Sequence, residues 1–327
     1  MGLFRASLLV VLSCTVMFTQ SAFGGNWNKS KKKAAQPVTP VQIDSGEVKE
    51  VSNFKEYSLS ASTDIVRAGQ TSQRFEIRHD DCGQDDTYSD CINDRRRIER
   101  LIDSKTWHDS VVWYGFSIFL PKDFPDLAPT NTTLTQVKLY SYREPLWDFN
   151  ARKNWFTFEA NASGQRCYAE VLHSMRGKWT DFALGIDYSI SGDEGDGAFD
   201  GKFFDLWVNG QQRTCNDALR PVLTKKMISK TKRGKARTHF DWGIYNSYVS
   251  RWLDRNKTKQ VKNKKFIDKH GQSGQVVESA SKRPFEIDWG VELPTQVVYY
   301  DEMRYGSSRD LVDITLLEKA GEYQPVD

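Results

Sequence analysis

The feature that most constrains this chain is the recurrence of short segments in which apolar and polar residues alternate one by one. Such alternation is the pattern of a β-strand that has one face buried. Residues 111–120 show it over the longest run, and Pro121 ends the segment. Their shared apolar face consists of Tyr114, Phe116, Ile118 and Leu120. Further strands are predicted at residues 73–79, 155–160, 182–190, 203–208 and 297–305.

Turn and helix signals agree with a fold made mainly of strands. Asn209-Gly210, directly after residues 203–208, is a strong signal for a two-residue β-hairpin turn. Helical periodicity is weak throughout, and the best candidate for a helix is the highly charged segment of residues 92–104. Many strands with polar turns and few helices predict an all-β protein, a two-sheet antiparallel β-sandwich of the jelly-roll, concanavalin-like kind.

The first residues of the chain predict export. Arg5 precedes a mostly apolar stretch, and Ala22-Phe23-Gly24 has the small-x-small pattern of a cleavage site. We expect a secreted or periplasmic protein with no integral membrane segment. The predicted organisation is a signal peptide over residues 1–24, a flexible tether over residues 25–45 and one domain over residues 46–320.

The cysteines predict disulfides. Cys14 lies within the predicted signal peptide, where lipid anchoring is the less favoured alternative. Four cysteines remain, and an even number in an exported chain favours disulfide bonds, with three possible connectivities. Cys82 and Cys91 flank a short polar loop, so we pair these two and leave Cys167 for Cys215.

The charges of this chain are gathered in patches, although its net charge is only +3. Residues 225–237 and 257–265 are rich in basic side chains. They form either an ordinary solvated surface or a basic rim that attracts a polyanion. Because export makes nucleic acid a poor partner, the expected partner is an anionic polysaccharide, which the protein would bind as a monomer.

An acidic, glycine-rich segment is the one candidate for a metal site. It carries Asp193, Glu194, Asp196 and Asp200. Their oxygen atoms could hold a structural calcium ion, but the spacing is not that of an EF-hand loop, and a plain surface loop is the simpler interpretation. No cofactor is expected to be required.

Arg74, Glu76 and Arg78 form the first group of residues that could carry chemistry. They share the polar face of one predicted strand, opposite Phe75 and Ile77. If the apolar face is inside, the polar face can line a groove in which one guanidinium binds a ligand carboxylate while Glu76 positions the other. A surface ladder of ion pairs is the alternative.

Two further groups follow along the chain. Gln136 and Lys138 share a strand face, and Tyr245 and Asn246 come directly after Gly243-Ile244. An amide and an ammonium on one face can bind a carboxylate. A cationic groove would stabilise the phenolate of Tyr245 and lower its pKa. We expect Tyr245 to line one concave sheet face together with Gln136, Lys138, Arg74, Glu76 and Arg78; a tyrosine packed at a sheet edge is the alternative.

These groups, in this order, resemble the jelly-roll polysaccharide lyases. Arg74-Phe-Glu76-Ile-Arg78, Gln136-x-Lys138 and Gly243-Ile-Tyr245-Asn246 are similar to the alginate lyase signatures R-T-E-L-R, Q-I-H and K-A-G-x-Y-N. The wider pattern resembles the heparin lyase I and glucuronan lyase group more closely. It includes the two-cysteine loop followed by Asp94-Arg95-Arg96-Arg97-Ile98-Glu99, the run from Trp113 to Pro121, and the closing Tyr299-Tyr300-Asp301-Glu302-Met303-Arg304.

The resemblance implies a polysaccharide lyase that cuts a uronic-acid-containing polymer by β-elimination. Arg78 and Gln136 would neutralise the uronate carboxylate, which acidifies the neighbouring C–H bond. Tyr245 would protonate the departing glycosidic oxygen and could also be the base. Arg74, Glu76 and Asn246 would bind substrate.

Two departures from the family pattern leave the mechanism open. Lys138 stands where the family usually has histidine, and Asp241 stands where it usually has lysine. Lys138 would be the base only if its surroundings favour the neutral amine; otherwise it neutralises the carboxylate and Tyr245 performs both proton steps. His173 and His239 are possible substitutes for the missing histidine.

Two other functions compete with a lyase. A non-catalytic glycan-binding protein would use exposed tryptophans, with Trp107, Trp147, Trp179 and Trp252 as candidates. A glycoside hydrolase would use Glu286, Asp288 and Glu292, but their spacing along one strand is too wide for a retaining carboxylate pair.

Overall fold

The computed structural model describes residues 41–42, 48–51, 54–79, 81, 83, 90, 93–104, 111–139, 145–160, 165–187, 204–215, 238–256, 275–276, 287–288, 291–321 and 323. All of them belong to one compact unit, Gln36–Asp327. The predicted signal peptide, Cys82, Cys91, the two lysine-rich segments and the acidic segment lie outside these residues. None of the helices described in this unit is long and apolar enough to cross a membrane.

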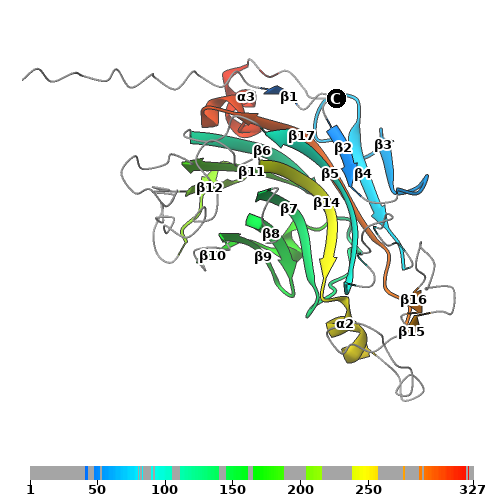
Figure 1. Cartoon of the computed structure of the whole chain (residues 1–327). Coiled ribbons are helices and arrows are strands. Elements are labelled where there is room, and N and C mark those ends of the chain that lie inside the picture. Colours follow the sequence, from blue (N-terminus) through cyan, green and yellow to red (C-terminus); the bar gives the residue numbers. More distant parts are fainter. Residues whose placement is uncertain are drawn as a thin grey trace, which may run out of the picture. The chain divides into compact units, whose positions relative to one another are not determined.

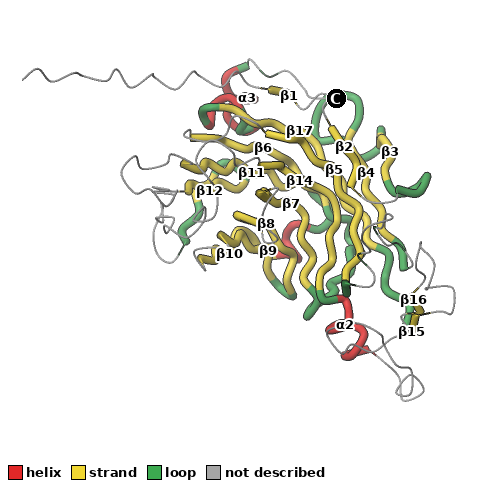
Figure 2. Tube along the Cα trace, viewed as in Figure 1, coloured by secondary structure: helices red, strands yellow, loops and turns green. Residues whose placement is uncertain are grey.

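Two antiparallel sheets form the unit (Figures 1 and 2). The first follows the order β13 (Gln211–Gln212), β12 (Phe204–Val208), β11 (Trp179–Asp187), β6 (Val111–Phe119), β17 (Gln296–Gly306), β4 (Ser72–Ile77) and β3 (Leu59–Ser62), and β1 (Val41–Gln42) also pairs with β17. The second follows the order β10 (Gln165–Val171), β9 (Trp155–Ala160), β8 (Pro145–Arg152), β7 (Asn131–Leu139), β14 (Thr238–Ser247), β5 (Arg95–Ser104) and β2 (Val48–Val51). We call them the eight-stranded and the seven-stranded sheet.

The remaining described elements are small. They are β15 (Gln275–Val276), β16 (Ile287–Asp288), α1 (Leu172–Met175), α2 (Val249–Asn256), α3 (Ile314–Ala320) and a 3-10 turn at Arg309–Leu311. β15 and β16 pair only with each other. The predicted antiparallel β-sandwich of the jelly-roll kind is therefore confirmed.

The core fills the space between the two sheets. Tyr114 from β6 packs edge-on against Trp147 from β8, with ring centroids 5.1 Å apart, and Phe116 packs against Phe149 at 5.5 Å. All four side chains are buried in one apolar cluster. The apolar face predicted for residues 111–120 is confirmed, and since each strand buries alternate side chains, its other side chains lie on the outer face of a sheet.

The hairpin signal is confirmed, but the predicted helix is wrong. Asn209 and Gly210 both have positive φ angles, 50° and 72°, and join β12 to β13. Residues 92–104, the best helix candidate, contain strand β5 instead. Ile98 and Ile102 of β5 are buried in the core, and the strand pairs with β14 on one side and β2 on the other. These long-range contacts override the local preference of arginine and glutamate for helix.

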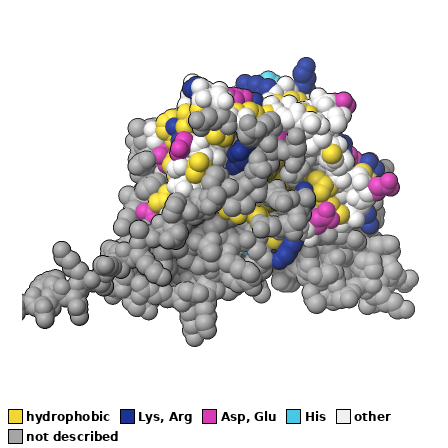
Figure 3. Space-filling model, turned by 90° about the horizontal axis from the view of Figure 1, so that it is seen from above, with side chains coloured by type: hydrophobic (Ala, Val, Ile, Leu, Met, Phe, Trp, Pro, Cys, Tyr) yellow, Lys and Arg dark blue, Asp and Glu magenta, His cyan; other side chains and the backbone are white. Residues whose placement is uncertain are grey.

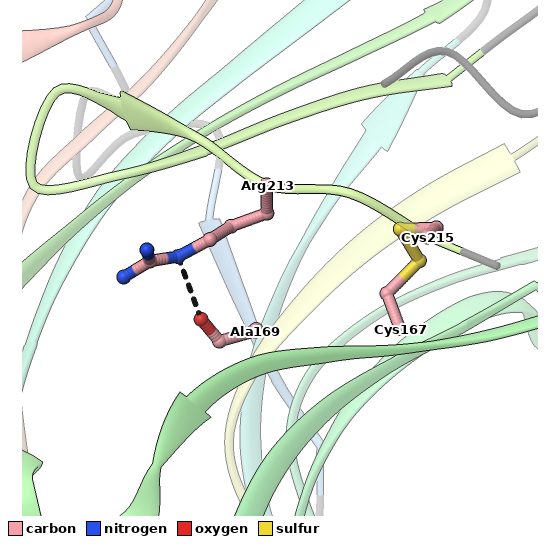
Figure 4. Close-up of a disulfide and its surroundings, with 4 residues drawn as sticks. All are labelled: Cys167, Ala169, Arg213 and Cys215. Atoms are coloured by element: carbon pink, nitrogen blue, oxygen red, sulfur yellow. Dashed lines mark hydrogen bonds between the residues drawn. A yellow bond between two sulfur atoms is a disulfide. The ribbon is translucent and has the colours of Figure 1, made fainter. Parts of the chain in front are cut away.

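One predicted disulfide is present among the described residues. Cys167 of β10 is bonded to Cys215, which follows β13, across a sequence separation of 48 residues. Close to this bond, Arg213 Nε donates a hydrogen bond of 3.0 Å to the carbonyl oxygen of Ala169 (Figure 4). The disulfide therefore ties the outermost strand of the seven-stranded sheet to the end of the eight-stranded sheet.

Candidate active site

The outer face of the seven-stranded sheet is organised in rows, because antiparallel register places side chains of neighbouring strands directly opposite each other. The central row consists of Arg97, Tyr245, Thr133, Asn150, Thr157 and Tyr168, from β5, β14, β7, β8, β9 and β10 in that order. Beside it runs a second row of Asp241, Gln136, Asp148, Glu159 and Arg166. Residues far apart in the sequence thereby share one surface.

A pocket of about 230 Å³ lies on this surface. Its walls are mostly polar, and they include three basic side chains and one acidic side chain. They consist of Arg95, Asn131, Thr133, Gln136, Lys138, Pro145, Asp148, Asn150, Arg152, Tyr245, Ser247 and Tyr248. Three predicted site residues, Gln136, Lys138 and Tyr245, are therefore brought together here.

A β-bulge positions Tyr245. The register between β14 and β7 shifts between Trp242 and Tyr245. Gly243 lies in this bulge with a φ angle of 140°, and a Cβ atom there would come within 2.2 Å of the Ile98 carbonyl oxygen. Only glycine fits so close to the neighbouring strand.

The bulge is supported from the opposite sheet. Tyr300 of β17 is fully buried, and its hydroxyl oxygen lies 2.7 Å from the carbonyl oxygens of both Leu134 and Gly243. The hydroxyl carries one hydrogen, so it donates to one carbonyl at a time. The two strands that hold Gln136 and Tyr245 are thus linked through one side chain that crosses the core.

The ring of Tyr245 lies between two cations. The Arg97 guanidinium carbon and the Lys138 Nζ atom are each 5.0 Å from the ring centroid. Burial raises the pKa of Tyr245 to about 12; Arg97 and Arg95 act to lower it, while Asp90 and Glu99 raise it further. The expected lowering of this pKa is therefore wrong, because burial outweighs the cations. Tyr245 is a neutral phenol at neutral pH, suited to donate a proton.

A buried carboxyl group lies beneath Gln136 and Lys138. Glu99 is fully buried, and its Oε1 accepts a hydrogen bond of 2.6 Å from Gln136 Nε2. Burial raises the pKa of Glu99 to about 7, against the attraction of Lys138 and Arg97. Lys138 Nζ lies 3.9 Å from Asp241 Oδ2. The two side chains that can meet a substrate carboxylate are thus held by acidic partners.

The sequence of this chain matches a protein family over most of its length. The family model described as polysaccharide lyase matches residues 29–271 of the 327. The chain belongs to this family. No curated protein sequence matches the lyase at a significant level.

Solved structures of low sequence identity resemble the lyase. An endo-β-1,4-glucuronan lyase from the fungus Trichoderma reesei has a TM-score of 0.47 and 14% identity, covering 85% of this chain and 98% of that chain. A β-glucanase catalytic domain from Podospora anserina has a TM-score of 0.44 and 10% sequence identity, and the match covers 86% of this chain and 88% of that chain. A family 7 alginate lyase, A1-II', has a TM-score of 0.41 and 8% sequence identity, and the match covers 78% of this chain and 86% of that chain.

The structure separates Arg74, Glu76 and Arg78 from the pocket. They lie on β4 and just after it, in the eight-stranded sheet, on the outer face opposite the buried Phe75 and Ile77. The prediction that they share one sheet face with Tyr245 is wrong, because alternation shows which residues share a face but not which sheet the strand joins. Glu76 is paired with both Arg74 and Arg78, which is the surface ladder weighed as the alternative.

Asn246 also lies away from the pocket. It is fully buried on the inner face of β14, where its Nδ2 donates to Gln296 Oε1 at 2.8 Å and its Oδ1 accepts from the Thr132 hydroxyl at 2.7 Å. The prediction that it binds substrate is wrong, because the alternation of β14 turns Asn246 inward while Tyr245 turns outward. Asn246 instead connects the two sheets.

Neither candidate histidine lines the pocket. His173 lies on α1, outside the pocket. His239 lies on β14 next to Asp241 and contacts its carboxylate. His239 is not among the residues that line the pocket.

Two basic residues to which the sequence analysis gave no role at the site, Arg95 and Arg97, come from β5. Arg95 lines the pocket, and Arg97 packs on Tyr245 while its guanidinium binds Asp90 through two hydrogen bonds of 2.9 and 3.0 Å. The alternation of Arg95, Arg97 and Glu99 in the sequence is the signal that could have identified them. The expectation of a helix over this segment concealed it.

The other candidates either lie elsewhere or lie outside the described residues. Trp147 is buried in the core, Trp179 packs against Phe119 on the outer face of the eight-stranded sheet, and Asp288 belongs to β16. Trp107, Glu286 and the acidic segment are outside the described residues. Within the described part of the chain, no three His, Cys, Asp or Glu side chains are grouped so that they could hold a metal ion.

Proposed function

We propose that the lyase cleaves a uronic-acid-containing anionic polysaccharide by β-elimination. The observation that carries this proposal is the composition of the pocket, in which an amide and several cationic groups surround a neutral phenol. Such a set suits a sugar that bears a carboxylate, since a neutral sugar offers the cations no counter-charge.

In this proposal, Lys138 and Gln136 bind the uronate carboxylate. Lys138 Nζ lies 3.9 Å from Asp241 Oδ2 and lines the pocket, so we assign it to neutralising the substrate carboxylate rather than to removing a proton. Gln136 uses one amide N–H for Glu99, and an amide nitrogen carries two. Neutralising the carboxylate stabilises the negative charge that develops when the adjacent C5–H proton leaves.

Tyr245 then moves the proton in a closed cycle. Its phenolate removes the C5 proton, and the electron pair of the broken C–H bond forms the C4–C5 double bond as the C4–O bond breaks. The resulting phenol gives its proton to the departing glycosidic oxygen. The phenolate is thereby regenerated, and no water is consumed. The raised pKa of Tyr245 makes the resting phenolate scarce but strongly basic.

Cleavage assays on a panel of polymers test this proposal. Purified protein is incubated with alginate, glucuronan, heparin and a neutral glucan, and the absorbance band of the unsaturated uronate product is followed. At least one uronate polymer should yield the band, and the neutral glucan none. Absence of the band with every uronate polymer, while the protein still binds one of them, would support the glycan-binding function instead.

A further inference from the structure

We propose that Trp155 and Tyr168 form a second sugar-binding subsite, distant from the bond that is cut, for another sugar of the same polyuronate chain. We call this pair the aromatic platform. The inference rests on the proposed function. It extends the binding site from one pocket to a surface that contacts several sugars of the same chain.

The two rings are exposed and in contact. The exposed fractions are 42% for Trp155 and 59% for Tyr168, and the ring centroids are 4.9 Å apart. Together with Val171 and Tyr248, they are the exposed large hydrophobic side chains of the described residues. Val171 is the register partner of Trp155, and Tyr248 lines the pocket. Exposed apolar area of the described molecule is thus gathered around this one sheet face, which is a mark of a binding surface.

Strand register connects the platform to the pocket. Tyr168 is the last member of the central row that contains Tyr245, and Trp155 is the register partner of Arg152, which lines the pocket. Tyr168 lies four strands from Tyr245, which at about 4.8 Å per strand is roughly 19 Å. Several sugar rings fit in that length, so a polymer that crosses the strands can reach both places and a very short oligosaccharide cannot.

The charges around the platform favour an acidic sugar. Arg152 and Arg166 share one carboxylate, Glu159, at 3.1 and 3.0 Å, so the three charges leave an excess of one positive charge. Arg152 Nε is buried and has no hydrogen-bond partner. Trp155 also lines a second pocket of about 630 Å³, whose charged lining residues are Lys153, Arg176 and Asp126. A uronate ring against the aromatic faces would therefore have its carboxylate near guanidinium and ammonium groups.

The platform is held in place before a ligand arrives. Tyr168 follows Cys167, whose disulfide to Cys215 fixes β10 from its buried side (Figure 4). An aromatic ring has only two side-chain torsions, so placing it on a fixed strand leaves little entropy to lose on binding.

Substitutions on the platform provide the test. Trp155→Ala, Tyr168→Ala and Trp155→Phe are compared with Trp179→Ala, which removes a tryptophan from the outer face of the other sheet. Each variant is assayed on the uronate polymer that the parent cuts and on the shortest oligosaccharide that the parent cuts. Melting temperature and molecular mass in solution are measured for every variant.

We expect the two alanine variants to raise KM for the polymer roughly 3–10-fold each, as loss of one aromatic contact predicts. Their kcat, and KM for the shortest oligosaccharide, should stay at the parent's values. Trp155→Phe should restore most of the loss, and Trp179→Ala should show none.

Each of the other possible outcomes would contradict a different part of the proposal. If the parent cuts the polymer and the platform variants match Trp179→Ala, the platform is wrong and the proposed function stands. Equal losses on short and long substrates would place the rings in the pocket rather than in a second subsite. A change of molecular mass would make the platform an interface between copies. If no uronate polymer is cut, the proposed function is wrong, and the assignment of a polyuronate chain to the aromatic platform is wrong as well.

Discussion

Glu76 and Glu99 each lie beside basic side chains on a β-strand, yet the two sheets give them opposite properties. Glu76 is on the outer face of the eight-stranded sheet. Burial acts to raise its pKa, but hydrogen bonds from Arg78 and Arg74 outweigh burial and hold the pKa below its usual value. Glu99 is beneath the pocket of the seven-stranded sheet, where burial raises its pKa to about 7 despite Lys138 and Arg97. The charge patterns are similar, and burial decides the result.

This difference separates a surface ladder from a functional site. On the eight-stranded sheet, acidic and basic side chains satisfy each other near solvent, and the side chain of Arg78 is 51% exposed. Figure 3, viewed from the side on which Figure 1 has β6 and β17, shows basic and acidic side chains interspersed over the described part of that face. Beneath the pocket, Glu99 is fully buried, and the low dielectric of a protein interior strengthens electrostatic interactions there.

The largest expected effect is a loss of activity on substitution of Tyr245, and Tyr299 on the other sheet provides the comparison. Tyr245→Phe should lower kcat by about 10²–10⁴-fold, since it removes the proton-transferring hydroxyl but keeps the ring. Polymer binding, measured by calorimetry, should be largely unchanged. Tyr299→Phe on the outer face of the eight-stranded sheet is the control and should retain activity. Near-normal turnover by Tyr245→Phe would remove the assigned role.

The pH dependence of cleavage tests the proton cycle. Below a pKa of about 12, the phenolate fraction of Tyr245 rises tenfold per pH unit. We therefore expect log kcat/KM to rise with a slope near one between about pH 7 and pH 10. Initial rates at fixed ionic strength provide the measurement. A flat profile would mean that Tyr245 acts only as the acid and that another group is the base.

A lysine and an arginine provide the next comparison. Lys138→Ala should lower kcat/KM roughly 10–100-fold, the range expected for a lost hydrogen bond to a charged group. Arg78→Ala should leave kcat/KM near the parent's value, because Arg78 directly follows β4 of the other sheet and packs over the Tyr57 ring. If Arg78→Ala were the inactive variant, the assignment of the pocket to the seven-stranded sheet would be wrong.

The smallest expected effects distinguish the two glutamates by stability. The native Glu99 carboxyl keeps a proton between about pH 4.5 and pH 7 that the unfolded chain has lost, so its contribution to stability falls as pH rises through this window. Glu99→Gln should therefore gain stability relative to the parent at pH 8, on the order of 1–3 kcal/mol, but not below about pH 4.5.

Glu76 should behave in the opposite sense. Its lowered pKa contributes stability above the unfolded value of 4.5, and this contribution is lost as pH falls through the folded pKa. Glu76→Gln should be less stable than the parent at pH 8 and similar to it in strong acid. Melting temperatures of both variants across pH provide the measurement, and equal signs for the two would contradict the comparison.

Local sequence patterns predicted most of the strands but not their partners. Alternation identified the buried faces of residues 73–79 and 111–120, and Asn209-Gly210 identified a hairpin, because each of these is set by neighbouring residues. The sheet that a strand joins depends on contacts between distant segments. That is why Arg78 was predicted beside Tyr245 and lies on the other sheet.

The sequence predicted three residues of the site, but neither its other residues nor its energetics. Gln136, Lys138 and Tyr245 lie in segments that resemble lyase motifs, and the structure brings them into one pocket, whereas Arg74, Glu76, Arg78 and Asn246 lie elsewhere. The direction of the Tyr245 pKa was missed, because sequence shows nearby cations but not the burial that outweighs them. Trp155 and Tyr168 meet only through the register of β9 and β10, which no local pattern reveals.

The rows of the seven-stranded sheet also suggest how such an enzyme can change in evolution. Tyr168 lies on the outermost described strand, while Tyr245 lies four strands further in. Extending or shortening the sheet at that edge would alter the footprint on the polymer in steps of one strand, without touching the groups that break the bond. Preference for chain length and chemistry of cleavage can therefore diversify separately within one sheet.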